Sequence, residues 1–174
     1  MQETNQRKCC NCHNPLRKVR LSGHYKRTVE IDVCEPCALI WFDGTETARL
    51  AGPGVIDLVR LIHAAKRSDY VGPLPGTLSC PDCSGALKEI RTQTRFGQTK
   101  QMHCPQRHGY LQTFVLYLAE KGFLRPLAWP DVKPLAGRTL FCAGCGAGME
   151  ARAQLACPYC RSNVGLLDPA RLAS

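Results

Sequence analysis

Five Cys-x2-Cys pairs, which contain ten of the 12 cysteines in this 174-residue chain, constrain its fold more than any other feature. A gap of two residues lets both thiolates turn towards one metal ion, and four thiolates suit the tetrahedral coordination of Zn²⁺. Disulfides are the alternative, but they are typical of secreted chains, and residues 1–8 lack the apolar segment of an export signal. The pattern therefore predicts zinc sites in a cytoplasmic chain whose thiols are reduced or metal-bound.

The first two pairs predict one zinc ribbon. Its expected ligands are Cys9, Cys12, Cys34 and Cys37. Between the pairs, residues 16–21 and 25–33 alternate apolar and polar side chains around a Ser-Gly turn, which is typical of a β-hairpin. We expect the apolar side of this hairpin, with Val29, Ile31 and Val33, to cover the metal.

An internal repeat at an offset of 71 residues predicts a second ribbon. At this offset, Cys9 and Cys12 fall on Cys80 and Cys83. Cys34 falls next to Cys104, and Cys37 falls on His108. The expected ligands are Cys80, Cys83, Cys104 and His108. Such a Cys3His set is an ordinary zinc site, because an imidazole nitrogen replaces one thiolate. His103 stays open as an alternative ligand, although the repeat favours His108.

The last two pairs predict a third ribbon. Its expected ligands are Cys142, Cys145, Cys157 and Cys160. Gly144 and Gly146 suit a tight turn there, since glycine tolerates positive φ. The fold class is thus a series of small zinc-stabilised β-rich modules with two short helical segments, α+β overall. The expected organisation is a first ribbon at 1–50, helix and linker at 51–79, a second ribbon at 80–110, helix and connector at 111–138, and a third ribbon at 139–174.

Two segments predict amphipathic helices. Residues 55–67 follow a Gly-Pro-Gly break, and residues 111–121 end at Gly122. We expect the apolar stripe of the first to pack on a ribbon, with partner docking as the alternative, and the aromatic side chains of the second to lie in a core. Thr45 predicts the N-cap of a further helix, with Glu46 in its first turn. No apolar run approaches the roughly 18–20 residues of a membrane span.

The formal net charge of +9 overstates the attraction to polyanions. Eleven thiolates binding three Zn²⁺ ions would lower it to +4, which makes global charge a modest argument for a nucleic-acid partner. The basic residues are concentrated on the first hairpin, where they are candidate contacts to nucleic-acid phosphates. These residues are Arg17, Lys18, Arg20, Lys26 and Arg27.

The first module resembles the zinc ribbon of the transcription factor IIB type. The matching residues are Cys9, Cys12, Leu16, Cys34, Cys37, Trp41, Asp43 and Glu46. Ala38 and Leu39 stand where the family pattern has Gly-Gly. The whole chain is similar to a bacterial group of small multi-ribbon proteins of unassigned activity. The resemblance implies zinc binding and a transcription-related role, with either protein or nucleic acid as the partner.

The residues outside the metal ligands do not form a catalytic arrangement. Each expected site has four protein ligands, whereas a catalytic zinc keeps one position open for water, so we do not expect an enzyme. Capping and dipole effects at a helix start explain Asp43 and Glu46 more simply than paired catalytic carboxylates do. Cys10 is surplus at the first site. It is either inert or a solvent-facing, redox-sensitive thiol whose pKa is lowered by Arg7 and Lys8.

The sequence favours a non-enzymatic zinc-binding scaffold or adaptor that docks on a protein partner. The expected docking surface combines the basic first hairpin with the exposed side of the helix at residues 55–67. Direct nucleic-acid binding through the first hairpin is one alternative, and a redox- or metal-responsive regulator using Cys10 is another. The identity of the partner, the oligomeric state and the relative arrangement of the ribbons stay open.

Overall fold

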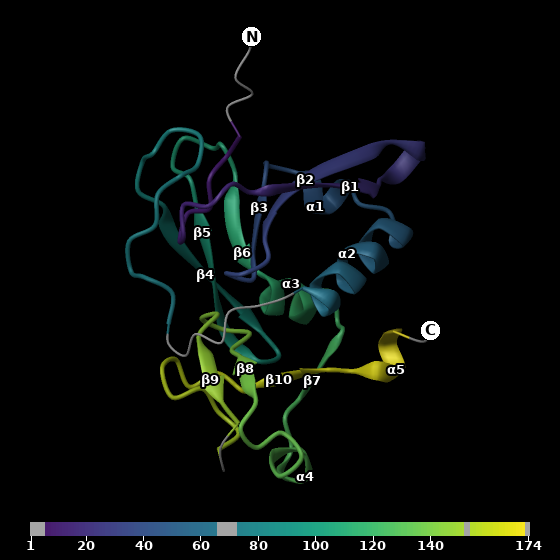
Figure 1. Ribbon diagram of the computed structural model, residues 1–174, viewed down its shortest axis with the longest axis vertical. Coiled ribbons are helices and arrows are strands. Elements are labelled where there is room, and N and C mark those ends of the chain that lie inside the picture. The colour runs from purple at the N-terminus through teal and green to yellow at the C-terminus, as the bar shows by residue number, and fades with distance from the viewer. Residues whose placement is uncertain (1–5, 66–72, 152–153, 173–174) are drawn as a thin grey trace. The chain divides into compact units, whose positions relative to one another are not determined.

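The computed structural model describes residues 6–65, 73–151 and 154–172 (Figure 1). It is a small α+β protein with mostly antiparallel strands, short helices and three groups of metal-ligating side chains, as the sequence predicts. The chain forms two compact units. Unit 1 comprises residues 1–67, 75–89 and 102–112, and unit 2 comprises residues 68–74, 90–101 and 113–174. In the described part of the chain, no helix has the length and apolar character needed to cross a membrane.

The first hairpin forms as the alternating pattern predicts. Its strands are β1 (Arg17–Ser22) and β2 (Thr28–Cys34), paired antiparallel from Arg17↔Val33 to Ser22↔Thr28. Val29, Ile31 and Val33 are buried, because one face of a half-buried strand carries every second side chain. The next strand, β3 (Leu39–Phe42), pairs antiparallel with β2 and is buried along its whole length.

The second repeat reproduces this order of strands. It contains β4 (Lys88–Thr94), β5 (Gly97–His103) and β6 (Tyr110–Thr113). Hydrogen bonding joins all six strands in the order β1-β2-β3-β6-β5-β4, which is symmetric about the β3–β6 pair. Each repeat alone would leave one edge of its third strand unpaired, and exposed strand edges are prone to unwanted pairing. Joining β3 to β6 satisfies both edges at once.

Helix α2 (Gly52–Ala64) packs against β1 and begins earlier than the sequence predicts. The Gly-Pro-Gly segment forms the first helical turn instead of a break, because Pro53 fits the first turn of a helix. Gly54 faces the backbone of Ser22 so closely that a Cβ would clash with its carbonyl oxygen. Leu58, Val59 and Ile62 are buried, which confirms packing on a ribbon. Residues 66–67, the end of the predicted helix, lie outside the described residues.

Unit 2 is built from short strands and helices. Its elements are α3 (Phe114–Glu120), β7 (Leu124–Pro126), α4 (Trp129–Val132), β8 (Thr139–Phe141), β9 (Gly148–Glu150), β10 (Gly165–Leu167) and α5 (Pro169–Leu172). Strands β7 and β10 form one antiparallel pair, and β8 and β9 form another. Near the end of the chain, residues 169–172 form the short helix α5.

The prediction of a helix from residue 111 was wrong at its start, since residues 110–113 form β6. Thr113 ends this strand and caps α3, because its Oγ1 accepts a hydrogen bond of 3.1 Å from the backbone N–H of Leu116. Phe114 and Tyr117 are buried, as expected for core aromatics. Gly122 follows the helix with a φ of 80°, which fits its predicted role as the helix stop.

Three candidate metal centres

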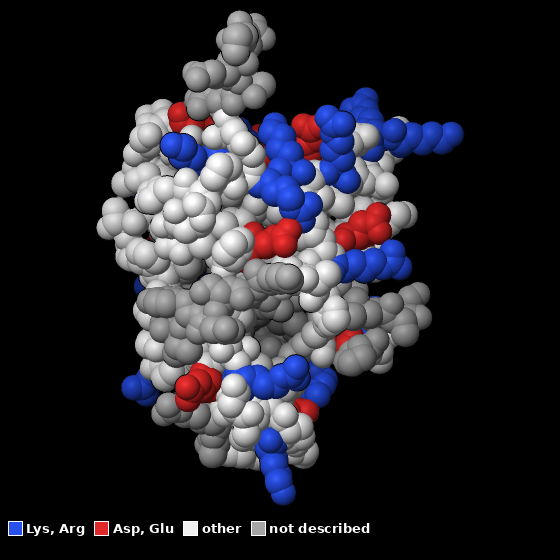
Figure 2. All heavy atoms as spheres, in the orientation of Figure 1, with Lys and Arg blue, Asp and Glu red and all other residues white. Residues whose placement is uncertain are grey.

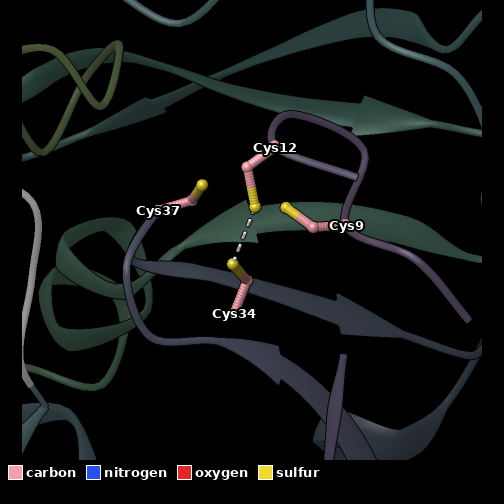
Figure 3. A group of neighbouring side chains, drawn as sticks. All are labelled: Cys9, Cys12, Cys34 and Cys37. Atoms are coloured by element: carbon pink, nitrogen blue, oxygen red, sulfur yellow. Dashed lines mark hydrogen bonds between the residues drawn. The ribbon is translucent and has the colours of Figure 1, made fainter. Parts of the chain in front are cut away.

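Figure 3 shows the first group of ligands around a common space between two loops. The group contains Cys9, Cys12, Cys34 and Cys37, whose sulfur atoms all lie within 4.8 Å of one another. The Sγ atoms of Cys12 and Cys34 are 3.6 Å apart. A disulfide needs about 2.05 Å, whereas tetrahedral Zn–S bonds of about 2.3 Å place two sulfurs about 3.8 Å apart. The geometry therefore fits one metal ion and excludes disulfides.

The second group combines three cysteines with His108 and lies in unit 1 as well. Its imidazole Nδ1 is 3.5 Å from Cys104 Sγ and 3.8 Å from Cys80 Sγ, and Cys83 Sγ is 3.7 Å from Cys104 Sγ. Tetrahedral Zn–S and Zn–N bonds of ordinary length require about 3.6 Å between sulfur and nitrogen. His103 lies outside the group, with its ring stacked on Tyr110 at 5.0 Å. The structure thus brings together the ligand set that the repeat favours.

The third group lies in unit 2 and has the same dimensions as the first. The sulfur of Cys142 is 3.5 Å from that of Cys160, and the sulfur of Cys145 is 3.7 Å from that of Cys157. Around it pack the buried side chains of Leu127, Ala147, Met149 and Val164. This apolar shell keeps water away from the sulfur atoms, so a bound metal would stabilise the core of the unit directly.

Five of the six ligand pairs are followed by a residue in the left-handed conformation, and in the longer Cys104–His108 loop that residue is Arg107 (63°), ahead of Gly109. The residue after the second ligand of each half has positive φ, which turns the chain back from the metal. These residues are His13 (59°), Ala38 (55°), Ser84 (59°), Gly109 (151°), Gly146 (75°) and Arg161 (63°). Ala38 is thus in the left-handed region although it is not a glycine. Backbone N–H groups inside the loops donate to sulfur, as from Asn11 to Cys9 (3.4 Å) and from Gly144 to Cys142 (3.2 Å).

Gly144 is required for a different reason from the one its sequence position suggests. It does not adopt positive φ. Instead, a Cβ at this position would lie 2.5 Å from Ser162 Oγ and 2.8 Å from the carbonyl oxygen of Gln98. The absence of a side chain lets the metal loop approach the hairpin of the second repeat within unit 2, where Lys100 donates to the carbonyl oxygen of Gly144 at 3.0 Å.

In both four-cysteine sites, the close approach of the sulfur atoms lowers the pKa of one thiol, which favours its thiolate form. Hydrogen bonds from Cys34 and Cys37 lower the pKa of Cys9 to about 4. In the third site, hydrogen bonding from Cys142 lowers the pKa of Cys145 to about 5. The pKa of each donor thiol, Cys34 and Cys142, is raised in return. A divalent cation would relieve this competition, because it stabilises every thiolate at once.

Arg7 joins the two centres of unit 1, a role that its place in the sequence does not reveal. Its Nη1 donates to Asp32 Oδ2 and to Asp43 Oδ2, both at 2.9 Å, and its Nε donates to Asp82 Oδ1 at 2.6 Å. Asp32 precedes the second loop of the first site by two residues, and Asp82 lies inside the first loop of the second site. The network reaches the second ligand group at Cys80, whose sulfur accepts from the backbone N–H of Asp82 at 3.4 Å.

Helix α1 (Glu46–Arg49) begins where the sequence predicts, with Thr45 at the N-cap position and Glu46 in the first turn, but its start is held by other bonds than a side-chain cap. The Thr45 side chain makes no capping hydrogen bond. Asp43 instead accepts from the indole of Trp41 at 3.0 Å and from Arg7, while Glu46 accepts from the backbone N–H of Asp43 at 2.7 Å. Burial raises the pKa of Glu46 to about 7, against the hydrogen bond from Asp43, which lowers it.

The surplus cysteine, Cys10, is not the solvent-facing thiol that a redox sensor requires. Its exposure is 6%. Burial, together with the charges of Cys9 and Cys80, raises its pKa to about 12, which is opposite to the lowering expected from neighbouring cations. A buried, protonated thiol reacts slowly with oxidants, so the structure favours the inert interpretation.

Figure 2 shows Lys and Arg side chains gathered over the hairpin of β1 and β2. Three of the five candidate phosphate contacts are paired with acids: Arg17 with Glu35, and both Lys18 and Arg20 with Glu30. The other two, Lys26 and Arg27, form no ion pair within the described residues. On α2, the exposed Arg60 pairs with Asp57, so the outer face of this helix is charged and solvated.

Comparisons with protein-family models, with curated proteins and with solved structures give no match to this chain.

Proposed function

We propose that this protein is a non-enzymatic adaptor in which three zinc ions fix binding surfaces, and that its principal partner is a protein. Each centre offers four protein ligands at the spacing of tetrahedral zinc, which leaves no coordination position for a substrate. Zinc thiolates persist in reducing compartments, which supports a cytoplasmic location. Metal analysis of protein purified without added metal tests the assignment: three zinc ions per chain are expected, whereas bound iron would contradict it.

The observation that carries the proposal is an exposed tryptophan held on a rigid turn in unit 2. The side chain of Trp129, the first residue of α4, is 62% exposed. Arg125 binds both carboxylate oxygens of Asp131 at 2.7 Å, and Asp131 accepts from the backbone N–H of Ala128 at 2.9 Å. The Arg125 guanidinium lowers the pKa of Asp131 to about 2. The contacts of Asp131 with Arg125 and Ala128 hold the turn in place, and Trp129 on this turn stays exposed.

A pocket of about 480 Å³ adjoins this tryptophan. Its lining includes Pro158, inside the Cys157–Cys160 loop of the third ligand group, and Leu155 and Arg161 on either side of that loop. Tryptophan and arginine are enriched among residues that dominate protein–protein binding energy, and an apolar pocket beside them can accept a partner side chain. Cys157, a ligand of the third centre, also lines this pocket. We therefore expect docking to depend on bound metal.

The docking surface predicted from the sequence, the first hairpin with α2, has less apolar character than this pocket. The buried stripe of α2 is used inside unit 1, and its outer face is charged. If the resemblance to the transcription factor IIB ribbon reflects function, transcription proteins are the first partners to test.

The test compares affinity purifications of wild-type protein and Trp129→Ala from nuclease-treated lysate, followed by binding measurements with the purified candidate. We expect one partner that binds the zinc-loaded wild type directly and at least tenfold more weakly to Trp129→Ala, as for an interface hot spot. Arg60→Ala, an exposed change in unit 1, is the matched control. Equal binding of wild type and Trp129→Ala would contradict the proposed surface.

Direct nucleic-acid binding is a second candidate function. The observation that favours it is the tip of the first hairpin, where Lys26 and Arg27 lack acidic partners in the described chain and Tyr25 is 92% exposed.

A further inference from the structure

We propose that the tip of the first hairpin is a binding site for single-stranded nucleic acid, in which Tyr25 stacks on a base and Lys26 and Arg27 contact phosphates. This site lies in unit 1; it rests on the second candidate function, direct nucleic-acid binding, and is independent of the proposed protein docking in unit 2. Four features of the tip support this site: its exposed aromatic ring, its backbone conformation, its polar pocket and its counterpart in the second repeat.

The backbone of the tip holds Tyr25 in solvent at a conformational cost. Tyr25 and Lys26 both adopt the left-handed region, with φ values of 56° and 58°. This region is unfavourable for side chains other than glycine, asparagine and aspartate, and a bulky residue there is a genuine outlier. The loop is closed by a hydrogen bond of 2.7 Å from the N–H of Gly23 to the carbonyl oxygen of Arg27. Strained residues of this kind occur preferentially at functional sites.

A polar pocket lies at the same tip, lined by residues on either side of Tyr25 in the chain. It has a volume of about 320 Å³ and is lined by Arg20, Lys26, Arg27, Ser22 and Thr28, together with Leu21 and Gly23. Arg20 is partly neutralised by Glu30, which its Nε contacts at 2.7 Å. The guanidinium and ammonium groups with two hydroxyls match the donors that bind phosphate oxygens.

In the second repeat, the equivalent tip is covered by other residues of the same unit. At the offset of 71, Tyr25 corresponds to Phe96. Phe96 is fully buried in unit 2, where its carbonyl oxygen accepts a hydrogen bond of 2.9 Å from Asn163 and its ring lies close to Gly165. Next to it, Gln98 accepts from Ser162 Oγ at 3.0 Å. The aromatic tip of that hairpin is thus a docking element.

The first tip keeps an aromatic residue but changes the charge around it. Lys26 and Arg27 stand at the positions of Gly97 and Gln98. The second tip is uncharged at these two positions and packs closely there, because Gly97 lies against Ser162, while its cation, Arg95, lies over the Phe96 ring at 5.0 Å. Two cations in their place disfavour such packing and favour an anion. A ligand that offers both an aromatic face and negative charge is a nucleic acid with unpaired bases, since duplex bases stack on one another and leave no free face.

The test measures fluorescence anisotropy of a labelled oligothymidylate about 12 nucleotides long, within the size range of single-strand sites, with zinc-loaded full-length protein. The variants are Tyr25→Ala, Tyr25→Phe and Lys26→Ala/Arg27→Ala. Arg60→Ala removes one exposed charge outside the tip as the matched control. Zinc content and circular dichroism establish that each variant is folded.

Three results are expected. Tyr25→Ala weakens binding by about 5- to 150-fold, the range for loss of one base stack, whereas Tyr25→Phe stays within about twofold. Tyr25→Ala leaves the salt dependence unchanged, because the ring carries no charge. The double variant lowers the log–log salt slope by about 1.4, the value for two phosphate contacts on a single strand at about 0.7 each.

Other results would overturn the proposal. Absence of binding by the zinc-loaded wild type at about 50 mM salt would exclude the site, because phosphate contacts are strong under that condition. Binding that Tyr25→Ala does not weaken would reduce the hairpin to a general cationic surface. Stronger binding to a matched duplex would contradict single-strand recognition. Because Trp129→Ala leaves the tip intact, failure here is distinguishable from failure of the protein-docking proposal.

Discussion

Replacement of Arg7 by alanine should destabilise unit 1 and weaken metal binding at its two centres together. The side chain of Asp32 is 6% exposed and that of Arg7 is 25% exposed. Removing one partner of a fully buried ion pair costs about 3–5 kcal/mol, chiefly because the other charge stays buried and unpaired. Water reaches the Arg7 side of this pair, so we expect a smaller cost than for a fully buried pair, about 2–3 kcal/mol.

Competition with a chromophoric chelator measures this effect. A loss of about 2–3 kcal/mol corresponds to release of zinc at about 30- to 150-fold lower chelator activity. We expect this shift for the two zinc ions of unit 1, because Arg7 contacts Asp32 beside the first centre and Asp82 within the second. The third zinc ion, in unit 2, should be released as in the wild type.

Two further variants test the reasoning. Asp32→Asn in the Arg7→Ala background removes the unpaired charge, so the double variant should be more stable than Arg7→Ala alone. Arg17→Ala removes an arginine from a more exposed ion pair, with side chains 53% and 32% exposed, and should cost less than about 1 kcal/mol. If the double variant were no more stable than Arg7→Ala, or if all three zinc ions were released equally, the proposed role of Arg7 would be wrong.

Three other substitutions have defined outcomes. Gly54→Ala should destabilise unit 1 by about 1–3 kcal/mol in thermal or chemical unfolding, because the new Cβ meets the backbone of Ser22, whereas Gly52→Ala, with open space around it, should be close to neutral. Burial raises the pKa of Glu46 from 4.5 to about 7, so its contribution to stability is present below pH 4.5 and is lost as pH rises through 7. Glu46→Gln should therefore gain about 1 kcal/mol relative to the wild type between pH 6 and 8, and an unchanged difference would refute the raised pKa. Cys34→Ser should release the first zinc ion and unfold the first hairpin while the third centre retains its metal; mass spectrometry under native conditions would count the ions, and full retention would contradict the ligand assignment.

The ligand groups could be predicted from the sequence because metal coordination in these loops is a local property. A two-residue gap and the residue types alone bring Cys9 and Cys12 to one ion, and the same holds for Cys142 and Cys145. The internal repeat then distinguishes His108 from His103. Strand alternation likewise predicted the buried face of the first hairpin, because the period of two is fixed by backbone geometry.

Tertiary packing decided the features that depend on residues far apart in the chain. The first turn of α2 lies against β1 because Gly54 has no side chain to clash with Ser22, and Cys10 is buried although no sequence pattern indicates it. In the sequence, nothing distinguishes Arg7 from the other basic residues. In the folded chain, it forms ion pairs with three carboxylates. The two hairpin tips are related in sequence but differ in burial. Phe96 is covered by residues of its own unit, whereas Tyr25 is exposed. Local spacing thus determined which residues can bind metal, whereas long-range contacts determined which of the remaining residues are free to bind a partner.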